Sequence, residues 1–245
     1  MVLLQIENLS RSFGGLLALQ EINFDLHEGE ILGIIGPNGS GKTTLFNLIT
    51  KFLKPDTGRI MFKGKDITKF KSHSICQTGI ARTFQLVKPF AHMTALQNVM
   101  VGRMYGREPA QNKRQAKIES EEILEFVGLG SKRLTVAHHL TLSDRKRLEL
   151  ARALATKPEL LLLDEMMAGL NPTEIRDALV LIKKIRDSGV TLMIVEHVVR
   201  AVLGISSRMM VLNVGKKIAE GTPQEIVRNR QVIEAYLGRE SYARG

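Results

Sequence analysis

Three short and almost continuous apolar runs are the clearest pattern along this chain. They cover residues 31–35, 160–163 and 190–195. Runs of this length are typical of strands, and continuous apolar character is typical of parallel strands that are covered on both faces. Polar residues follow each run directly. Because open α/β sheets bind ligands beyond the carboxyl ends of their strands, we expect the three polar clusters to converge on one site.

The first part of the chain has a different pattern, in which apolar and polar residues alternate loosely up to about residue 29. A period of two is typical of half-buried strands, and Gly14-Gly15 and Glu28-Gly29 indicate turns. Residues 59–62 form another short apolar-rich stretch. This quarter of the chain is therefore predicted to form an antiparallel sheet that leads into the parallel core.

One helix is well marked between the second and third apolar runs. Asn171 can cap it, Pro172 suits the first helical position, and Glu174 completes a capping pair. Gly189 follows its end. The spacing predicts one buried face, made of Ile175, Ala178, Leu179, Ile182 and Ile185. Two strands joined by such a helix form a βαβ crossover.

The polar cluster after the first apolar run matches Gly-x-x-x-x-Gly-Lys-Ser/Thr, the phosphate-binding loop of the P-loop nucleotidases. Its glycines let the backbone wrap around an anion, and the helix predicted over residues 43–50 adds a partial positive charge. Lys42 would reach the β- and γ-phosphates of a nucleoside triphosphate, and the Thr43 hydroxyl would ligate Mg²⁺. The predicted nucleotide-binding residues are Gly36, Pro37, Asn38, Gly39, Ser40, Gly41, Lys42, Thr43 and Thr44.

Two acidic residues, Asp164 and Glu165, follow the second apolar run. An acidic residue at the end of a buried strand can hold Mg²⁺ through its water shell, which suits Asp164. Glu165 lies one position beyond the strand, where it can orient or deprotonate an attacking water. A strand that simply ends in solvated charges is the alternative, but the phosphate loop upstream favours phosphotransfer chemistry.

The composition limits the cellular compartment and the kinds of partner that the chain can have. The 245 residues carry a net charge of +10 and a single cysteine, Cys76, which excludes an internal disulfide and fits a reducing compartment. No apolar run approaches the ~18 residues needed to span a bilayer, and the N-terminus is unlike a signal peptide. We expect a cytosolic protein. The basic residues are scattered and aromatics are few, which favours a solvated basic surface over a membrane surface, and both over nucleic acid.

Four short features accompany these motifs in a fixed order: Phe13, Gln85, the Gly-Leu-Asn sequence at 169–171, and His197. Together with the two acidic residues, they resemble the ATP-binding subunits of ATP-binding-cassette (ABC) transporters over nearly the whole chain. The resemblance implies that Phe13 stacks on adenine, that Gln85 reaches Mg²⁺, and that His197 contacts the γ-phosphate. Residues 169–171 correspond to the D-loop, which crosses to the opposite subunit in this family.

The resemblance also implies a fold. It is an α/β P-loop nucleotidase of the ABC ATPase type, with an N-terminal antiparallel β subdomain, a RecA-like core and a helical insertion. We expect one ABC ATPase domain over residues 1–245. The β subdomain and nucleotide core would take about 1–86 and 150–245, and the helical subdomain about 87–149. A charged helical pattern over residues 113–127 fits that insertion.

The family signature, Leu-Ser-Gly-Gly-Gln, is altered here. Counting back from residues 147–154 places it on Leu140, Thr141, Leu142, Ser143 and Asp144. Leu142 and Ser143 replace both glycines, and Asp144 replaces glutamine. Backbone N–H groups can still face a phosphate there only if φ is negative, because leucine at positive φ is strained. In the family, the signature acts in trans on ATP held by the partner, so we expect a heterodimer in which the altered signature weakens only the site that it completes.

Within the family, the chain most resembles the ATP subunits of branched-chain amino acid importers, in segments such as residues 82–85, 169–172, 195–197 and 221–226. This implies Mg²⁺ and ATP as cofactors, a second ABC ATPase subunit, two membrane permease subunits and, indirectly, an extracytoplasmic solute-binding protein. The chain would lie at the cytoplasmic face of the membrane. Importers of urea or short amides and lipopolysaccharide exporters share many of these segments and stay open as alternatives.

Other classes fit less well. A GTPase would carry Asn-Lys-x-Asp for guanine, and residues 63–66 do not match it. ABC ATPases that act in DNA repair or on ribosomes typically contain either long coiled coils or two cassettes in tandem. This chain resembles a single cassette and has no heptad run. A weakly hydrolysing regulatory subunit is the third alternative, which the altered signature suggests and which the intact Lys42, Asp164 and Glu165 oppose.

Overall fold

The computed structural model describes residues 1–85 and 87–237. The chain forms two compact units. Within the described residues, the first unit combines 1–71 with 191–237, and the second comprises 72–85 and 87–190. The division places residues 31–35 and 191–195 in the first unit and the second apolar run, residues 160–163, in the second.

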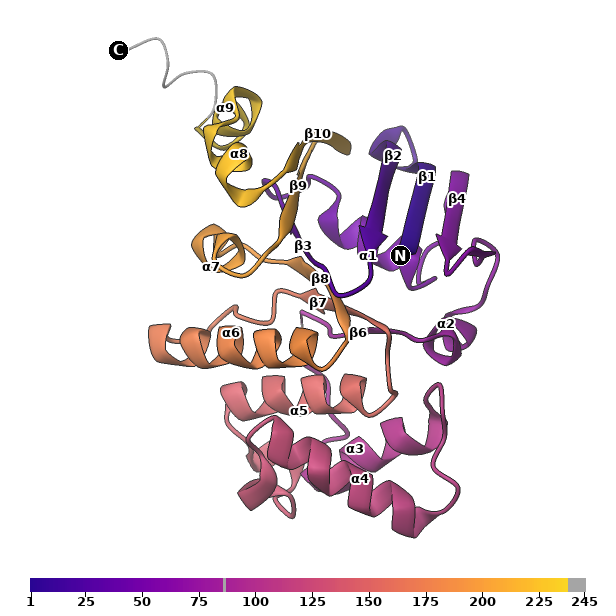
Figure 1. Cartoon of the computed structure of the whole chain (residues 1–245), viewed down its shortest axis with the longest axis vertical. Coiled ribbons are helices and arrows are strands. Elements are labelled where there is room, and N and C mark those ends of the chain that lie inside the picture. The colour runs from indigo at the N-terminus through magenta and orange to yellow at the C-terminus, as the bar shows by residue number, and fades with distance from the viewer. Residues whose placement is uncertain (86, 238–245) are drawn as a thin grey trace. The chain divides into compact units, whose positions relative to one another are not determined.

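An antiparallel sheet begins the first unit, as the alternating pattern predicts (Figure 1). Its strands follow the order β2-β1-β4-β5. Gly14 takes a left-handed conformation, with φ 58°, in the turn between the two long strands. The four strands are β1 (Val2–Phe13), β2 (Leu16–His27), β4 (Thr57–Phe62) and β5 (Lys65–Asp66).

The parallel strands of the first unit surround β3 (Ile31–Ile35), whose five residues are all buried. β3 pairs in parallel with β8 (Thr191–Val195) on one side and with β9 (Arg208–Asn213) on the other. β10 (Lys216–Gly221) continues antiparallel to β9. The predicted strands at the first and third apolar runs are therefore confirmed. The helices of this unit are α1 (Lys42–Ile49), α7 (Val199–Leu203), α8 (Pro223–Arg228) and α9 (Arg230–Leu237).

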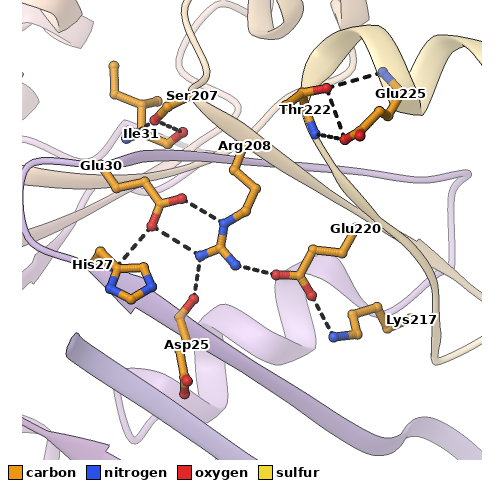
Figure 2. Close-up of polar contacts among 10 residues, drawn as sticks. All are labelled: Asp25, His27, Glu30, Ile31, Ser207, Arg208, Lys217, Glu220, Thr222 and Glu225. Carbon is orange, nitrogen blue, oxygen red and sulfur yellow. Dashed lines mark hydrogen bonds and ion pairs between the residues drawn. The ribbon is translucent and has the colours of Figure 1, made fainter. Parts of the chain in front are cut away.

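An ion-pair network around Arg208 joins the two sheets of the first unit (Figure 2). The guanidinium donates to both carboxylate oxygens of Glu30, at 2.7 and 3.0 Å, and also to Glu220. It donates in addition to the backbone carbonyl of Asp25 in β2. Lys217 extends the network to Glu220 at 2.5 Å. One side chain of β9 thus holds β2, the turn before β3, and β10 in a fixed arrangement.

The second unit contains a parallel pair of strands, β6 (Ile80–Arg82) and β7 (Leu160–Asp164), and a layer of helices. β7 is fully buried and confirms the strand predicted at the second apolar run. Three helices pack side by side (Figure 1), and the predicted helical insertion, about residues 87–149, contains the first two and the start of the third. They are α3 (Ala95–Tyr105), α4 (Lys113–Phe126) and α5 (Leu142–Leu154). Shorter elements are α2 (Ser72–Thr78) and the 3₁₀ turns Gly130–Lys132 and Ala137–His139.

α6 (Pro172–Asp187) is the helix that the sequence marks most clearly. The Asn171 side chain accepts from the N–H of Thr173 and of Glu174, both at 3.0 Å, and the capping pair with Glu174 is complete. The prediction of its start is confirmed. Its buried face consists of Ala178, Leu181, Ile182 and Ile185, whereas two of the residues predicted for it, Ile175 and Leu179, are only half-buried.

A buried amine lies just after α1. Lys51 takes a left-handed conformation with φ 61°, and within the described residues no group accepts a hydrogen bond from its buried ammonium nitrogen. Burial lowers the pKa of Lys51 to about 8, although the charge of Asp66 opposes the shift. The charged form of this side chain is therefore disfavoured in the folded protein.

We predict that Lys51→Met raises the free energy of unfolding by about 2 kcal/mol near neutral pH. The unfolded chain keeps this lysine protonated up to about pH 10.5, whereas the folded protein releases the proton near pH 8. The wild-type protein should therefore gain stability as the pH rises between these two values, and the variant should lack that gain. Urea unfolding at the two ends of the range measures both effects.

Lys63→Met is the matched control, because Lys63 has a similar left-handed φ of 52° but an exposed side chain. Its effect should stay within about 0.5 kcal/mol at both pH values. If the stabilisation by Lys51→Met stays the same at high pH, the buried ammonium is not the cause of the lower stability of the wild-type protein.

Candidate functional site

The phosphate loop leaves the buried strand β3 at Gly36, where a side chain has no room. A Cβ atom on Gly36 would lie 2.1 Å from the carbonyl oxygen of Leu212, and φ is 156°. Gly41 is equally constrained, because a Cβ there would lie 2.6 Å from the carbonyl oxygen of Ala18. Neighbouring backbone therefore explains why two of the motif positions are glycines. Gly39, with φ 77°, has open space around it.

Lys42 opens α1 and turns back over the loop. Its ammonium group donates to the carbonyl oxygens of Gly36 at 2.7 Å and of Pro37 at 2.9 Å. Ser40 is buried beside it, whereas Thr43 is exposed and Thr44 half-buried. Gly41 caps α1 and has no side chain that could accept from the first N–H groups of the helix. Backbone donors and an ammonium group thus meet at one helix N-terminus, which suits a phosphate anion.

His197 lies at the same edge of the sheet as the phosphate loop. β8 runs parallel to β3, with Val195 opposite Ile34, so both strands end together. His197 follows that end and is exposed. Phe13 ends β1 with 45 % of its surface exposed, and the Arg11 guanidinium lies 5.1 Å from its ring centroid. The first unit therefore brings the loop and His197 to one edge.

The second unit places three other predicted residues, Gln85, Asp164 and Glu165, near the ends of β6 and β7. Arg82 forms an ion pair with Asp164, at 2.6 Å between Nη2 and Oδ2, and both side chains are buried. The backbone N–H of Asp164 donates to the Thr83 hydroxyl at 3.2 Å. The Gln85 amide donates to Glu165 Oε2 at 2.7 Å. Gln85, Asp164 and Glu165 are all residues that the sequence predicts for the site.

The backbone of Glu165 has an unusual conformation. Its φ is 49°, which is uncommon for a residue other than glycine, and its surface is only 7 % exposed. Such backbone strain persists only where the surroundings hold it in place, and it is often found at functional sites. The Glu165 carbonyl oxygen accepts a hydrogen bond from the Lys146 ammonium at 3.2 Å.

The altered signature forms the start of α5. Thr141 caps the helix by accepting from the N–H of Asp144 at 3.2 Å, and Leu142 and Ser143 have no positive φ. Both residues therefore have the φ that their N–H groups need in order to face a phosphate without strain. Partial burial would raise the pKa of Asp144, but hydrogen bonds from Lys132 and Thr141 hold it below its usual range. Lys132 lies at 2.6 Å and balances the charge of Asp144.

Four residues of the second unit escaped the sequence analysis: Arg82, Thr83, Lys146 and Glu149. Arg82 and Thr83 lie just before Gln85, so their proximity to a predicted site residue was an available signal. Lys146 and Glu149 lie three positions apart in α5. Their spacing places them on one face of a helix, but only the structure shows that this face is buried.

In the described part of the chain, no helix combines the length and the apolar character needed to cross a membrane.

Residues 19–168 match the family described as "ABC transporter", and residues 216–242 match the family described as "Branched-chain amino acid ATP-binding cassette transporter". The chain is 39% identical to the high-affinity branched-chain amino acid transport ATP-binding protein LivG of Escherichia coli, over 96% of this chain and 98% of the relative. It is 32% identical to the lipopolysaccharide export system ATP-binding protein LptB of Haemophilus influenzae, over 97% and 98% of the two chains.

Among solved structures, the ADP conformation of MJ1267, an ATP-binding cassette of an ABC transporter, superimposes with a TM-score of 0.87. Its sequence is 34% identical, and the match covers 98% of this chain and 100% of that one. The predicted fold class is confirmed. The chain belongs to the ABC transporter family, as an ATP-binding cassette that hydrolyses ATP.

Proposed function

We propose that this chain hydrolyses MgATP to drive the uptake of branched-chain amino acids, or of related small solutes, through a membrane permease. The observation that carries the proposal is the match of residues 216–242 to the branched-chain amino acid cassette family, outside the general ABC region. The likeness to LivG over nearly the whole of both chains supports it. Lipopolysaccharide export is the second candidate, because the relative LptB is 32% identical.

The loop geometry supports the proposed nucleotide-binding roles. The glycines at 36 and 41 admit backbone where a side chain would clash, and Lys42 already lies among loop carbonyls. An incoming phosphate would give this ammonium group a stronger, charged partner. The loop from Gly36 to Thr44 would hold the phosphates, with Phe13 against adenine.

Magnesium would be held by oxygen ligands, namely the Thr43 hydroxyl, the Gln85 amide and the Asp164 carboxylate. Hydroxyl, amide and carboxylate oxygens suit a hard divalent cation, so the donor set fits. Magnesium neutralises charge on the phosphates when it is bound. Arg82 holds one Asp164 oxygen at 2.6 Å, which fixes the orientation of this buried carboxylate.

Glu165 would act as the general base that orients and deprotonates the attacking water, and His197 would contact the γ-phosphate. The Gln85 amide holds one Glu165 carboxylate oxygen at 2.7 Å, so the two side chains are oriented together. The strained backbone of Glu165 supports a catalytic role over a purely structural one.

We also propose the assembly. This chain would pair with a second, different ABC ATPase subunit and with two permease subunits at the cytoplasmic face of the membrane, while a solute-binding protein delivers the solute. ATP-driven closure of the two ATPase subunits would couple nucleotide state to transport. The helical subdomain, about residues 87–149, would transmit the movement. The altered signature at Leu140–Asp144 would complete the partner's nucleotide site.

We predict that Glu165→Gln lowers the ATP turnover of the native complex by about 10²- to 10⁴-fold, because the amide cannot accept the proton of water. Binding of a fluorescent ATP analogue should remain, since the phosphate loop is untouched. Steady-state hydrolysis and equilibrium binding measure the two effects. Glu122→Gln, an exposed glutamate of α4, is the control and should leave turnover unchanged. More than half of the wild-type turnover in Glu165→Gln would exclude Glu165 as the base.

We predict that Leu142→Gly with Ser143→Gly leaves hydrolysis at this chain's own Walker residues unchanged. The signature acts in trans, so the change should raise hydrolysis only at the partner's phosphate loop. The measurement is the turnover of the purified heteromeric complex in which the partner's catalytic glutamate is replaced by glutamine. Two glycines near a helix start cost roughly 1 kcal/mol each, so melting temperatures are compared in parallel. A large rise at this chain's own site would contradict the heterodimer.

We predict that leucine, isoleucine or valine stimulates ATP turnover when the native complex and its solute-binding protein are reconstituted in proteoliposomes. Labelled amino acid should accumulate inside, and Glu165→Gln should abolish the accumulation. Stimulation by urea or short amides instead, or by lipopolysaccharide without any binding protein, would reject branched-chain amino acids as the transported class.

A further inference from the structure

Two charged side chains lie on the buried face of α5, the helix that begins with the altered signature. Lys146 is 6 % exposed and Glu149 is 8 % exposed. Charged residues are rarely buried unless they are paired or hydrogen-bonded, because leaving water costs free energy. Their positions, three apart, place them on the same face of the helix. Each contacts backbone of the candidate site.

Lys146 contacts the residue that we propose as the general base. Its ammonium group donates to the Glu165 carbonyl oxygen at 3.2 Å, and the contact is buried. This is the peptide group that follows the strained φ of 49°. A charged donor at that carbonyl stabilises the backbone turn, which in turn directs the Glu165 side chain.

Glu149 contacts the segment that carries Gln85. Its Oε1 accepts a hydrogen bond from the Phe84 N–H at 2.7 Å, one residue before Gln85. Burial raises the pKa of Glu149 to about 7. The Phe84 N–H and the charges of Arg152 and Lys146 oppose this shift, and the charge of Asp164 adds to it. Burial disfavours the charged form of this carboxyl group, and carboxyl groups with pKa values perturbed in this way are common at functional sites.

The contacts form a closed loop. α5 holds the Glu165 carbonyl through Lys146 and the Phe84 N–H through Glu149, and the Gln85 amide bonds the Glu165 carboxylate. We propose that Lys146 and Glu149 are positioning residues, which set the orientation of the Glu165 carboxylate for hydrolysis. This inference rests on the proposed role of Glu165 as general base.

The test compares four variants of the native complex by steady-state kinetics. Lys146→Met and Glu149→Met keep the length of the side chain but remove the donor or the acceptor. We expect each to lower kcat at least about tenfold, since small misplacements of reacting groups have effects of this size or larger. The KM for ATP should change less than about twofold, because the phosphate loop is untouched. Lys146→Arg and Glu149→Gln keep a donor and an acceptor and should retain most of kcat.

A structural defect alone would not give this split, and a double-mutant cycle sharpens it. If Glu149 acts through Gln85, Glu149→Met should have little further effect on kcat in a Gln85→Ala background. Additive losses would overturn the inference. Lys117→Met, an exposed lysine of α4, controls for the loss of a helical lysine and should have no effect. Should Glu149→Met fail to fold, Lys146→Met and its arginine partner decide the outcome, because Lys146 contacts a different backbone group.

Glu165→Gln separates failure of this inference from failure of the proposed function. If Glu165→Gln keeps its turnover, the proposed base is wrong and the positioning role falls with it. If Glu165→Gln abolishes turnover while Lys146→Met and Glu149→Met keep it, the general base stands and the positioning role is overturned.

Discussion

The burial of strand β3 is the constraint on which the arrangement of the first unit depends. All five of its residues are buried, and parallel neighbours lie on both sides. The strand cannot shift without moving β8 and β9. Its end therefore delivers Gly36 to a fixed point against the Leu212 carbonyl, where only glycine fits. The Arg208 network ties β9 and the turn before β3 to β2 (Figure 2), so the phosphate loop is supported from the antiparallel sheet as well.

The main constraint in the second unit is the burial of charged side chains. Asp164, Glu165, Lys146 and Glu149 are all buried, and each has a charged or backbone partner. Removal of one partner from such a cluster costs more than the pair contributes, because an uncompensated charge is left behind. We therefore expect the loss of any one of these residues to disturb its neighbours, including the orientation of Glu165.

The sequence predicts whatever depends on local pattern. It locates β3, β7 and α6, because continuous apolar runs and a complete cap at Asn171 are local signals. It also names Gln85 and Glu165, which the structure joins at 2.7 Å. It misses contacts across long separations, such as Glu149 with Phe84, since nothing in a helical pattern tells which partner covers a face. The buried position of Leu181 was missed for the same reason.

The altered signature affects the stability of the first turn of α5. Glycine inside a helix costs about 1 kcal/mol relative to alanine, so a start with leucine and serine, capped by Thr141, is stiffer than one with two glycines. Lys132 also binds Asp144 and fixes the first turn. On the proposed assembly, the replacement of both glycines would weaken only the partner's nucleotide site, because α5 keeps a capped first turn and still holds Lys146 at the Glu165 carbonyl.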